Sequence, residues 1–177
     1  LFYSRRPNIE IRGQYEFKYH VDFDHLDIQE DTGAICISRP TNPTGNVVTD
    51  EEILELREIA VRRDIPLIID GAYGAPFPNI IFTEVTPIWD PGVIVCLSLS
   101  KFGMPGVRTG IVVADDTVIR AVTSANAILS LSPGSFGPVL VTEAMRSGEF
   151  LRISTDLIRP HYRHHLNQTV AWIRDEL

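Results

Sequence analysis

The 177-residue sequence contains only two cysteines, Cys36 and Cys96, and no long apolar run. A helix that spans a bilayer needs roughly 18 or more apolar residues in a row, whereas the longest runs here, such as 93–97, have the length of a strand. Both cysteines lie in apolar segments that we expect to be buried strands, and two cysteines make no disulfide framework. We therefore expect a soluble protein of a reducing, cytoplasmic compartment that does not bind a membrane.

Positive charge is also scarce. Sixteen Lys and Arg residues stand against 23 Asp and Glu, which gives a formal net charge of −7. A protein that binds nucleic acid usually presents a basic face, so this balance argues against a nucleic-acid partner. Hydrophobic residues make up 44% and charged residues 22% of the chain, the ordinary mixture of a folded globular domain.

No repeat, low-complexity tract or flexible linker divides the chain. The first residue is Leu1 rather than methionine, and no signal-peptide pattern follows it, so we expect a piece of a longer chain. Apolar runs at 34–38, 66–69 and 93–97 predict three buried strands. The first two are separated by a predicted helix, an order that implies parallel pairing.

That helix has a clear start. Thr49 and Glu52 form a capping-box pattern, and the helix is expected to end near Arg63. Apolar residues recur on one face at Ile53, Leu56 and Ala60.

A fourth apolar strand, Thr109–Ala114, follows the third after only a short stretch. A parallel return usually needs a dozen or more residues, so we expect this strand to be antiparallel.

Three further helices are predicted in the C-terminal part. The first begins at Asp115 or Asp116 and has Val118, Ile119, Val122 and Ala125 on one face. The second covers 136–145, and the third covers 149–177 with a kink near Pro160. A break is expected at 133–138, and the segment 14–22 alternates weakly, as a strand would.

Each of the three buried strands ends in polar residues. Asn42 in Asn-Pro-Thr-Gly follows the first, Asp70 and Tyr73 follow the second, and Ser98-Leu99-Ser100-Lys101 follows the third. Ligands of open α/β sheets bind beyond the carboxyl ends of parallel strands. Taken singly these residues have ordinary explanations, because such an asparagine forms turns, an aspartate caps helices and a lysine carries surface charge.

The segment 98–110 is more specific. It places two serines, Lys101, three glycines and Arg108 directly after a buried strand. Hydroxyl and guanidinium groups bind phosphate, and an amine attaches an aldehyde as a Schiff base. The segment lacks the Gly-Lys-Ser/Thr ending of a P-loop and the glycine spacing of a dinucleotide site. A cofactor that carries both a phosphate and an aldehyde fits this pattern, and we expect no metal site.

With Asn-Pro-Thr-Gly at 42–45, Asp-x-x-Tyr at 70–73 and Ser-x-Ser-Lys at 98–101, the sequence resembles the fold-type I aminotransferases that use pyridoxal 5'-phosphate. The resemblance implies an α/β fold: a three-layer α/β/α large domain with a mostly parallel sheet and one antiparallel strand, Thr109–Ala114. Residues 1–150 would then be the central part of that domain. Residues 151–177 would be a long helix that leads toward a small domain absent here.

The resemblance also implies a role for each matching residue. Lys101 would hold the cofactor and then move the proton of the substrate Cα. Asp70 would pair with the pyridine nitrogen, and Asn42 and Tyr73 would donate to the ring 3'-oxygen. The phosphate would be held by Ser98, Ser100 and Arg108.

The activity implied is transamination between a small aliphatic amino acid, valine or alanine, and a 2-oxo acid, pyruvate or 2-oxoisovalerate, by a homodimer in amino acid biosynthesis. Another aminotransferase or a C–S β-lyase of the same fold would use the same residues, and a regulator that only binds the cofactor is the alternative of another class. Residues 1–37 show neither the phosphate-binding loop nor the stacking aromatic of the family, and the arginine that binds the substrate carboxylate is absent. We therefore expect the isolated fragment to be a poor catalyst.

Overall fold

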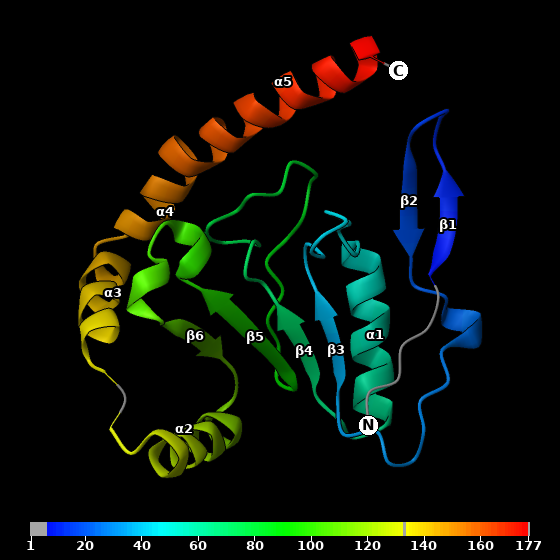
Figure 1. Cartoon of the computed structure of the whole chain (residues 1–177). Coiled ribbons are helices and arrows are strands. Elements are labelled where there is room, and N and C mark those ends of the chain that lie inside the picture. Colours follow the sequence, from blue (N-terminus) through cyan, green and yellow to red (C-terminus); the bar gives the residue numbers. More distant parts are fainter. Residues whose placement is uncertain (1–6, 133, 177) are drawn as a thin grey trace.

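The centre of the fold is a four-stranded sheet in the order β3-β4-β5-β6 (Figure 1). The computed structural model describes residues 7–132 and 134–176. The strands are Ile35–Ser38 (β3), Leu67–Asp70 (β4), Val93–Ser98 (β5) and Gly110–Val113 (β6). The first three are parallel and β6 is antiparallel to β5. The predicted mostly parallel sheet with one antiparallel strand is therefore confirmed.

One face of the sheet packs against helix α1, Asp50–Arg62. Leu67, Ile69 and Val93 of the sheet form a buried cluster with Ile53, Leu56 and Ala60 of the helix. These are the helix positions that the 3.6-residue period predicted. A fully buried leucine or isoleucine contributes about 1.5–3 kcal/mol, so this cluster fixes the helix on the sheet.

The opposite face of the sheet is less well covered. Cys36 pairs with Ile68, and Ile68 with Ile94. Cys36 is exposed and Cys96 is half-buried, so the prediction that both cysteines are buried was wrong. The described helices that pack on the sheet are α1, α3 (Phe136–Arg146) and α4 (Glu149–Ile153), and they reach the face of Leu67 and Leu97. Because neighbouring side chains alternate between faces, Cys36 points away from these helices.

A second buried cluster lies at the other end of the sheet. It joins Leu97 and Leu99 to Val141 of α3, Phe136–Arg146, and to Phe150 of α4, Glu149–Ile153. Phe77, Phe102 and Phe150 pack ring against ring, with centroids 4.4 to 6.0 Å apart. This cluster holds the segment after β5 against the helices.

The predicted long C-terminal helix is interrupted where a kink was expected. A π-helical turn, Ser154–Ile158, separates α4 from α5, Arg159–Glu176. Pro160 lacks the N–H of a regular helix, and irregular turns of this kind accompany such positions. Ser154 is buried and its hydroxyl donates to the carbonyl of Pro78 at 2.8 Å. From there α5 extends to the hairpin of β1 (Asn8–Ile11) and β2 (Phe17–His20), where Arg174 contacts Glu16 at 2.5 Å (Figure 1).

The N-terminal part contains a hairpin of β1, Asn8–Ile11, and β2, Phe17–His20. The second strand lies within the predicted segment. The first was missed, although polar and apolar residues alternate along its four exposed residues. Val21 joins the hairpin to α1, since its N–H donates to Glu52 Oε1 at 2.7 Å. A single 3-10 turn, Phe23–His25, follows.

Helix α2, Asp116–Ser130, begins as predicted, because Asp115 accepts from the N–H groups of Thr117 and Val118. None of its residues is buried. The expected apolar face therefore lacks cover within the described residues, where Val122 remains 45% exposed. The break predicted at 133–138 corresponds to the gap between α2, which ends at Ser130, and α3, which begins at Phe136 within the predicted range. Pro133 itself lies outside the described part, as do Leu1 and Leu177. No helix in the described ranges has the length and apolarity needed to cross a membrane.

Glu52 yields a prediction about acid stability. Burial opposes its ionisation, but hydrogen bonds from Thr49, Val21 and His20 outweigh burial and lower the pKa of Glu52 below its usual 4.5. The stability that the carboxylate adds is thus complete above pH 4.5 and is lost as the pH falls through the lower folded value. We expect Glu52→Gln to cost about 1–2 kcal/mol at neutral pH and less in acid.

Urea denaturation at several pH values measures this difference in the free energy of unfolding. Glu58→Gln is the matched control, because Glu58 is on the same helix, is 67% exposed and has only a 3.8 Å ion pair with Arg62. A Glu52→Gln penalty that stays constant down to pH 3 would contradict the account.

Candidate active site

The carboxyl ends of β3, β4 and β5 meet at one edge of the sheet. Ser38, the last residue of β3, is in register with Asp70, the last residue of β4, and Asp70 is in register with Cys96. Ser98 ends β5 two residues further on. The three segments that carry the predicted site residues therefore leave the sheet side by side.

The first segment is the loop that contains Asn42. The Thr41 N–H donates to the carbonyl of Asn46, and the Gly45 N–H donates to the carbonyl of Thr41, both at 2.8 Å. Gly45 has φ +69°, a conformation that glycine adopts without strain. The predicted turn is confirmed, and it holds Asn42 exposed at the sheet edge.

The second segment turns sharply after β4. Asp70 Oδ1 accepts from the Ala72 N–H at 3.0 Å. Gly74 approaches the Arg39 backbone so closely that a Cβ there would lie 2.5 Å from the Arg39 carbonyl oxygen. This approach brings the Tyr73 hydroxyl to 3.5 Å from Asn42 Nδ2.

The third segment brings Lys101 to the same place. Lys101 lies in a 3-10 turn, Ser100–Phe102, that ends at Gly103 with φ +102°. Its Nζ is 5.1 Å from the centroid of the Tyr73 ring. Asn42, Tyr73 and Lys101, from three separate segments, thus form one contiguous group.

Ser98, Ser100 and Arg108 form a second group beside it. The Ser100 N–H donates to Ser98 Oγ at 3.2 Å, and Arg108 Nη1 donates to Ser100 Oγ at 3.3 Å. Arg108 has φ +47° at the end of the 3-10 turn Pro105–Val107. Two hydroxyls and a guanidinium gathered in this way are suitable donors for a phosphate.

The chemistry of these donors fits a phosphate-bearing aldehyde. Lys101 Nζ and Asp70 Oδ2 have no hydrogen-bond partner within residues 7–132 and 134–176, so the amine and one carboxylate oxygen are available to a ligand. Both residues are exposed. Burial, followed by the nearby Asp70 charge, raises the pKa of the Cys96 thiol, which keeps it protonated. Across the same residues no group of three His, Cys, Asp or Glu side chains is placed to bind a metal.

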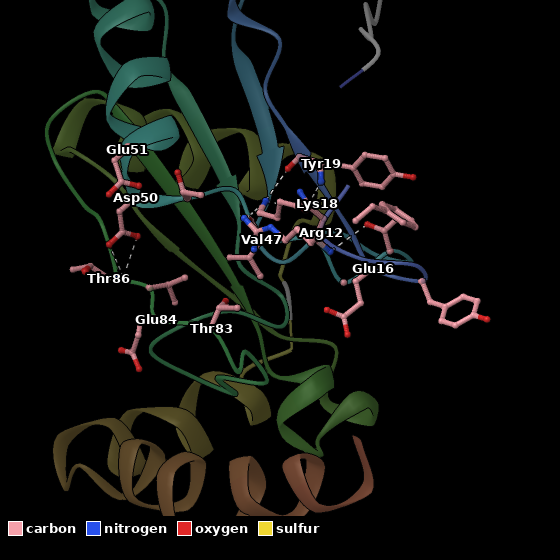
Figure 2. A pocket seen from close by; sticks show the side chains of 17 residues that line it. Arg12, Glu16, Lys18, Tyr19, Val47, Asp50, Glu51, Thr83, Glu84 and Thr86 are labelled. Atoms are coloured by element: carbon pink, nitrogen blue, oxygen red, sulfur yellow. Dashed lines mark hydrogen bonds between the residues drawn. The ribbon is translucent and has the colours of Figure 1, made fainter. Parts of the chain in front are cut away.

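Two pockets flank the loop that contains Asn42. The one of about 700 Å³ is lined by Asn42 and Tyr73 and, from α5, by Tyr162, His165 and Leu166. The other, of about 800 Å³, lies between the hairpin and the segment 83–86 (Figure 2). Thr44, Gly45 and Val47 line both pockets, so this loop is the wall between them. Of the candidate site residues, Asn42 and Tyr73 line the pocket of about 700 Å³ and none lines the other.

The sequence analysis missed Arg39, a buried residue that supports the sheet edge where β3, β4 and β5 end. It is only 6% exposed, and its guanidinium donates to the carbonyls of Val48 and Thr86 and pairs with Asp50. Burial of Asp50 opposes its ionisation, yet the hydrogen bonds from Arg39 and Thr86 lower the pKa of this carboxyl. In the sequence Arg39 is only a charged residue directly after a predicted strand, which does not indicate that it is buried.

Comparison with known proteins agrees with this geometry. The profile of the family described as aminotransferase class I and II matches residues 5–173. The chain belongs to this family. The resemblance drawn from the three motifs is thereby confirmed.

Individual relatives place the chain more closely. The valine–pyruvate aminotransferase of Escherichia coli (strain K12) is 53% identical over 174 residues, which are 98% of this chain and 42% of that protein. The crystal structure of valine–pyruvate aminotransferase from Salmonella typhimurium LT2 superposes with a TM-score of 0.92 at 53% identity, over 97% of this chain and 44% of that one. The chain thus spans less than half the length of these relatives.

A more distant relative shows how far the fold extends. A double mutant of Thermus thermophilus aspartate aminotransferase matches with a TM-score of 0.68 at 26% identity, over 77% of this chain and 36% of that one. The α/β class and the mixed sheet of this chain are therefore those of the fold-type I aminotransferases.

The close approach of Gly74 gives a prediction. Gly74→Ala would push the new methyl group against the Arg39 carbonyl, and we expect it to lower the free energy of unfolding by about 1–3 kcal/mol. Gly33→Ala is the control, because a Cβ at Gly33 meets nothing within 4 Å, and it should change stability by less than about 0.5 kcal/mol. Urea denaturation measures both. Equal effects of the two substitutions would show that the approach is not tight.

Proposed function

We propose that this chain is the part of a pyridoxal-phosphate-dependent aminotransferase that contains the cofactor-binding lysine, Lys101. The complete protein would have the length of its relatives. The observation that supports this most directly is the group at the sheet edge, with Lys101 Nζ 5.1 Å from the Tyr73 ring and Asn42 Nδ2 3.5 Å from the Tyr73 hydroxyl. The 53% identity to valine–pyruvate aminotransferase over nearly the whole chain supports the same function.

When bound, pyridoxal 5'-phosphate supplies an aldehyde and a protonated ring that accepts electrons from the substrate Cα. Lys101 would hold the aldehyde through its amine, and its Nζ would be the group that carries the substrate Cα proton. Asp70 is suited to hold the proton on the ring nitrogen, because its Oδ2 is unused within the described segments. A carboxylate beside that nitrogen keeps the ring charged, since an opposite charge favours the protonated form.

The remaining residues orient the cofactor. Asn42 and Tyr73 each carry a donor that can reach the ring 3'-oxygen, and their mutual contact holds the two donors together. Ser98, Ser100 and Arg108 bind the phosphate. Because Arg108 already contacts Ser100, the phosphate donors are gathered in advance and little side-chain entropy is lost on binding.

The proposed substrates are a small aliphatic amino acid, valine or alanine, and a 2-oxo acid, pyruvate or 2-oxoisovalerate. The amino group of the amino acid would pass to the carbonyl carbon of the oxo acid. The new oxo oxygen would come from water in the first half-reaction, and the oxygen of the acceptor would leave as water in the second. This choice follows the activity of the two valine–pyruvate aminotransferases that are 53% identical to this chain. The role that fits these substrates is amino acid biosynthesis.

The proposal includes the surroundings of the site. Residues 1–150 are the central part of a large cofactor-binding domain, and 151–177 lead to a small domain that supplies the substrate-carboxylate arginine. The complete protein is a cytoplasmic homodimer. Asn42, Asp70, Lys101 and Arg108 are all exposed, which agrees with a site whose cover comes from further chain or from a second subunit.

Covalent labelling tests the cofactor site. The complete protein is incubated with pyridoxal 5'-phosphate and reduced with borohydride, and the modified residue is located by peptide mass. We expect stoichiometric label on Lys101, because its amine lies within the group of site residues. Lys101→Ala should lose the label, and the other lysines of the complete protein are the internal control for non-selective reaction. Label spread over several lysines, or absent from Lys101, would refute the proposal.

Asp70 tests the chemistry. With valine as donor and pyruvate as acceptor, Asp70→Ala should retain cofactor but lose transamination by roughly a hundredfold or more, since each pKa unit of lost stabilisation is worth about 1.4 kcal/mol. Asp64→Ala is the control, because Asp64 is an exposed carboxylate at the far end of the crossover. Cofactor absorbance measures whether the cofactor is retained, and a fixed-time product assay measures transamination. Near-normal turnover by Asp70→Ala would refute its role.

A further inference from the structure

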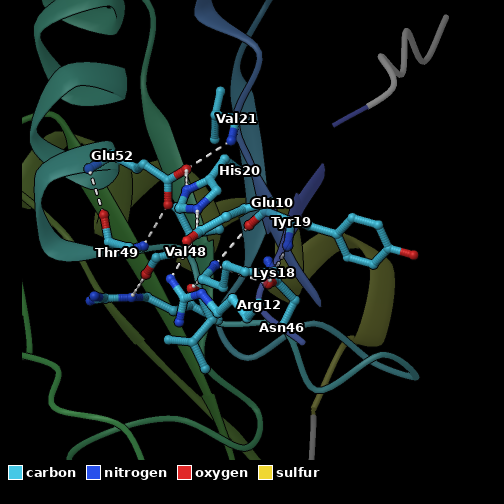
Figure 3. Close-up of polar contacts among 12 residues, drawn as sticks. Glu10, Arg12, Lys18, Tyr19, His20, Val21, Asn46, Val48, Thr49 and Glu52 are labelled. Carbon is cyan, nitrogen blue, oxygen red and sulfur yellow. Dashed lines mark hydrogen bonds and ion pairs between the residues drawn. The ribbon is translucent and has the colours of Figure 1, made fainter. Parts of the chain in front are cut away.

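The ammonium group of Lys18 has three well-placed acceptors. Its Nζ donates to the backbone carbonyl of Tyr19 at 2.7 Å, to that of Val47 at 2.8 Å, and to Asn46 Oδ1 at 2.9 Å (Figure 3). An ammonium has three donors, so all of them are used. Burial is the largest influence on the pKa of Lys18 and lowers it. The three hydrogen bonds replace the contacts with water that the buried ammonium has lost.

Lys18 is itself held firmly in place. Its strand β2 is tied to helix α1 through Glu52, which accepts from the Val21 N–H at 2.7 Å and contacts His20 Nδ1 at 3.1 Å. His20 Nε2 in turn contacts Glu10 of β1 at 2.9 Å. The hairpin is therefore attached to the same helix whose N-terminus follows the loop of Asn42, as Figure 3 shows.

Asn46 is the link from Lys18 to the site. Its side-chain oxygen accepts from Lys18 and, at 3.3 Å, from the Tyr19 N–H. Its backbone carbonyl accepts from the Thr41 N–H at 2.8 Å, which closes the loop immediately before Asn42. Displacement of Asn46 would therefore displace the residue that contacts the Tyr73 hydroxyl.

We propose that Lys18 is a positioning residue of the active site, which acts through Asn46 to hold Asn42 against Tyr73. This inference rests on the proposed function for its effect on the cofactor. Lys18 lies in the pocket on the far side of the loop from Tyr73, so it touches neither cofactor nor substrate. Lys18 acts from the other side of the loop and fixes the direction of Asn42 Nδ2, the donor proposed for the ring 3'-oxygen.

The first test needs no cofactor. Hydrogen exchange is measured at the Thr41 and Gly45 amides of the complete apo protein, for Lys18→Met and Asn46→Ala. Both variants should exchange roughly tenfold faster or more at these two amides, because loss of a hydrogen bond to a charged group frees the loop. Asn46→Asp retains a side-chain oxygen acceptor and should exchange nearly as the parent does. Amides within α1 report whether the variants remain folded.

Arg12→Met is the matched control. Arg12 is a cation of the same hairpin, but its contact is with the exposed Glu10 side chain, at 2.9 Å. Its loss should leave the Thr41 and Gly45 amides unchanged. Exchange that is equally slow in Lys18→Met, Asn46→Ala and the parent would overturn the inference.

The second test reads the effect on the cofactor. The visible absorbance of cofactor bound at Lys101 is titrated with pH, and the midpoint should rise in Asn46→Ala and Lys18→Met, as in Asn42→Ala, because a donor to the 3'-oxygen has been displaced. The double variant Asn46→Ala/Asn42→Ala should show no further rise, since both changes remove one interaction. Arg12→Met controls for the simple loss of a positive charge.

The outcomes separate the two proposals. The positioning role would be overturned if the Thr41 and Gly45 amides exchange fast in Asn46→Ala but the absorbance midpoint does not change, while Asn42→Ala does change that midpoint. A complete protein in which Lys101 takes up no cofactor would overturn the proposed function instead, and the exchange measurement would still decide whether Lys18 holds this loop.

Discussion

The parallel pairing of β3, β4 and β5 is the constraint on which the candidate site depends. Parallel strands end at the same edge, and the register that sets Ser38 beside Asp70 and Asp70 beside Cys96 brings three loops together there. A slip of one residue in β4 would turn Asp70 to the other face of the sheet. The buried residues Leu67 and Ile69 oppose such a slip, because it would expose both. Hydrophobic packing on one face thus fixes the position of a carboxylate at the edge.

Beyond the sheet, polar contacts between distant segments keep the loops in place. Arg39, buried beneath the edge, joins the end of β3 to the start of α1 through Asp50. Gly74 permits backbone to approach backbone where no side chain would fit. Lys18 holds the outer side of the loop, and Ser154 and Arg159 attach the C-terminal helix to the carbonyls of Pro78 and Ile81. The result is a rigid set of loops around residues that are themselves exposed.

The exposed surfaces of the chain agree with its share of its relatives' length. Cys36 is exposed, no residue of α2 is buried, and Lys101 is open to solvent. The two relatives that are 53% identical have more than twice as many residues. Exposed apolar side chains such as Ile128 and Leu129 of α2 usually mark surfaces that other protein covers when they form a patch.

The sequence by itself determined three parallel strands, predicted at 34–38, 66–69 and 93–97 and found at 35–38, 67–70 and 93–98. It also determined the start of α1 at Thr49, the antiparallel β6 and the kink near Pro160. These depend on apolar periodicity, capping residues and connection lengths, which act between neighbours in the chain. It also determined which residue types stand at the strand ends, and hence the family. Only the tertiary structure decided that Arg39 is buried, that Cys36 is not, and that Lys18 reaches Asn46. Those contacts join segments that are far apart in sequence, or depend on which face of the sheet is covered, and no local pattern records either.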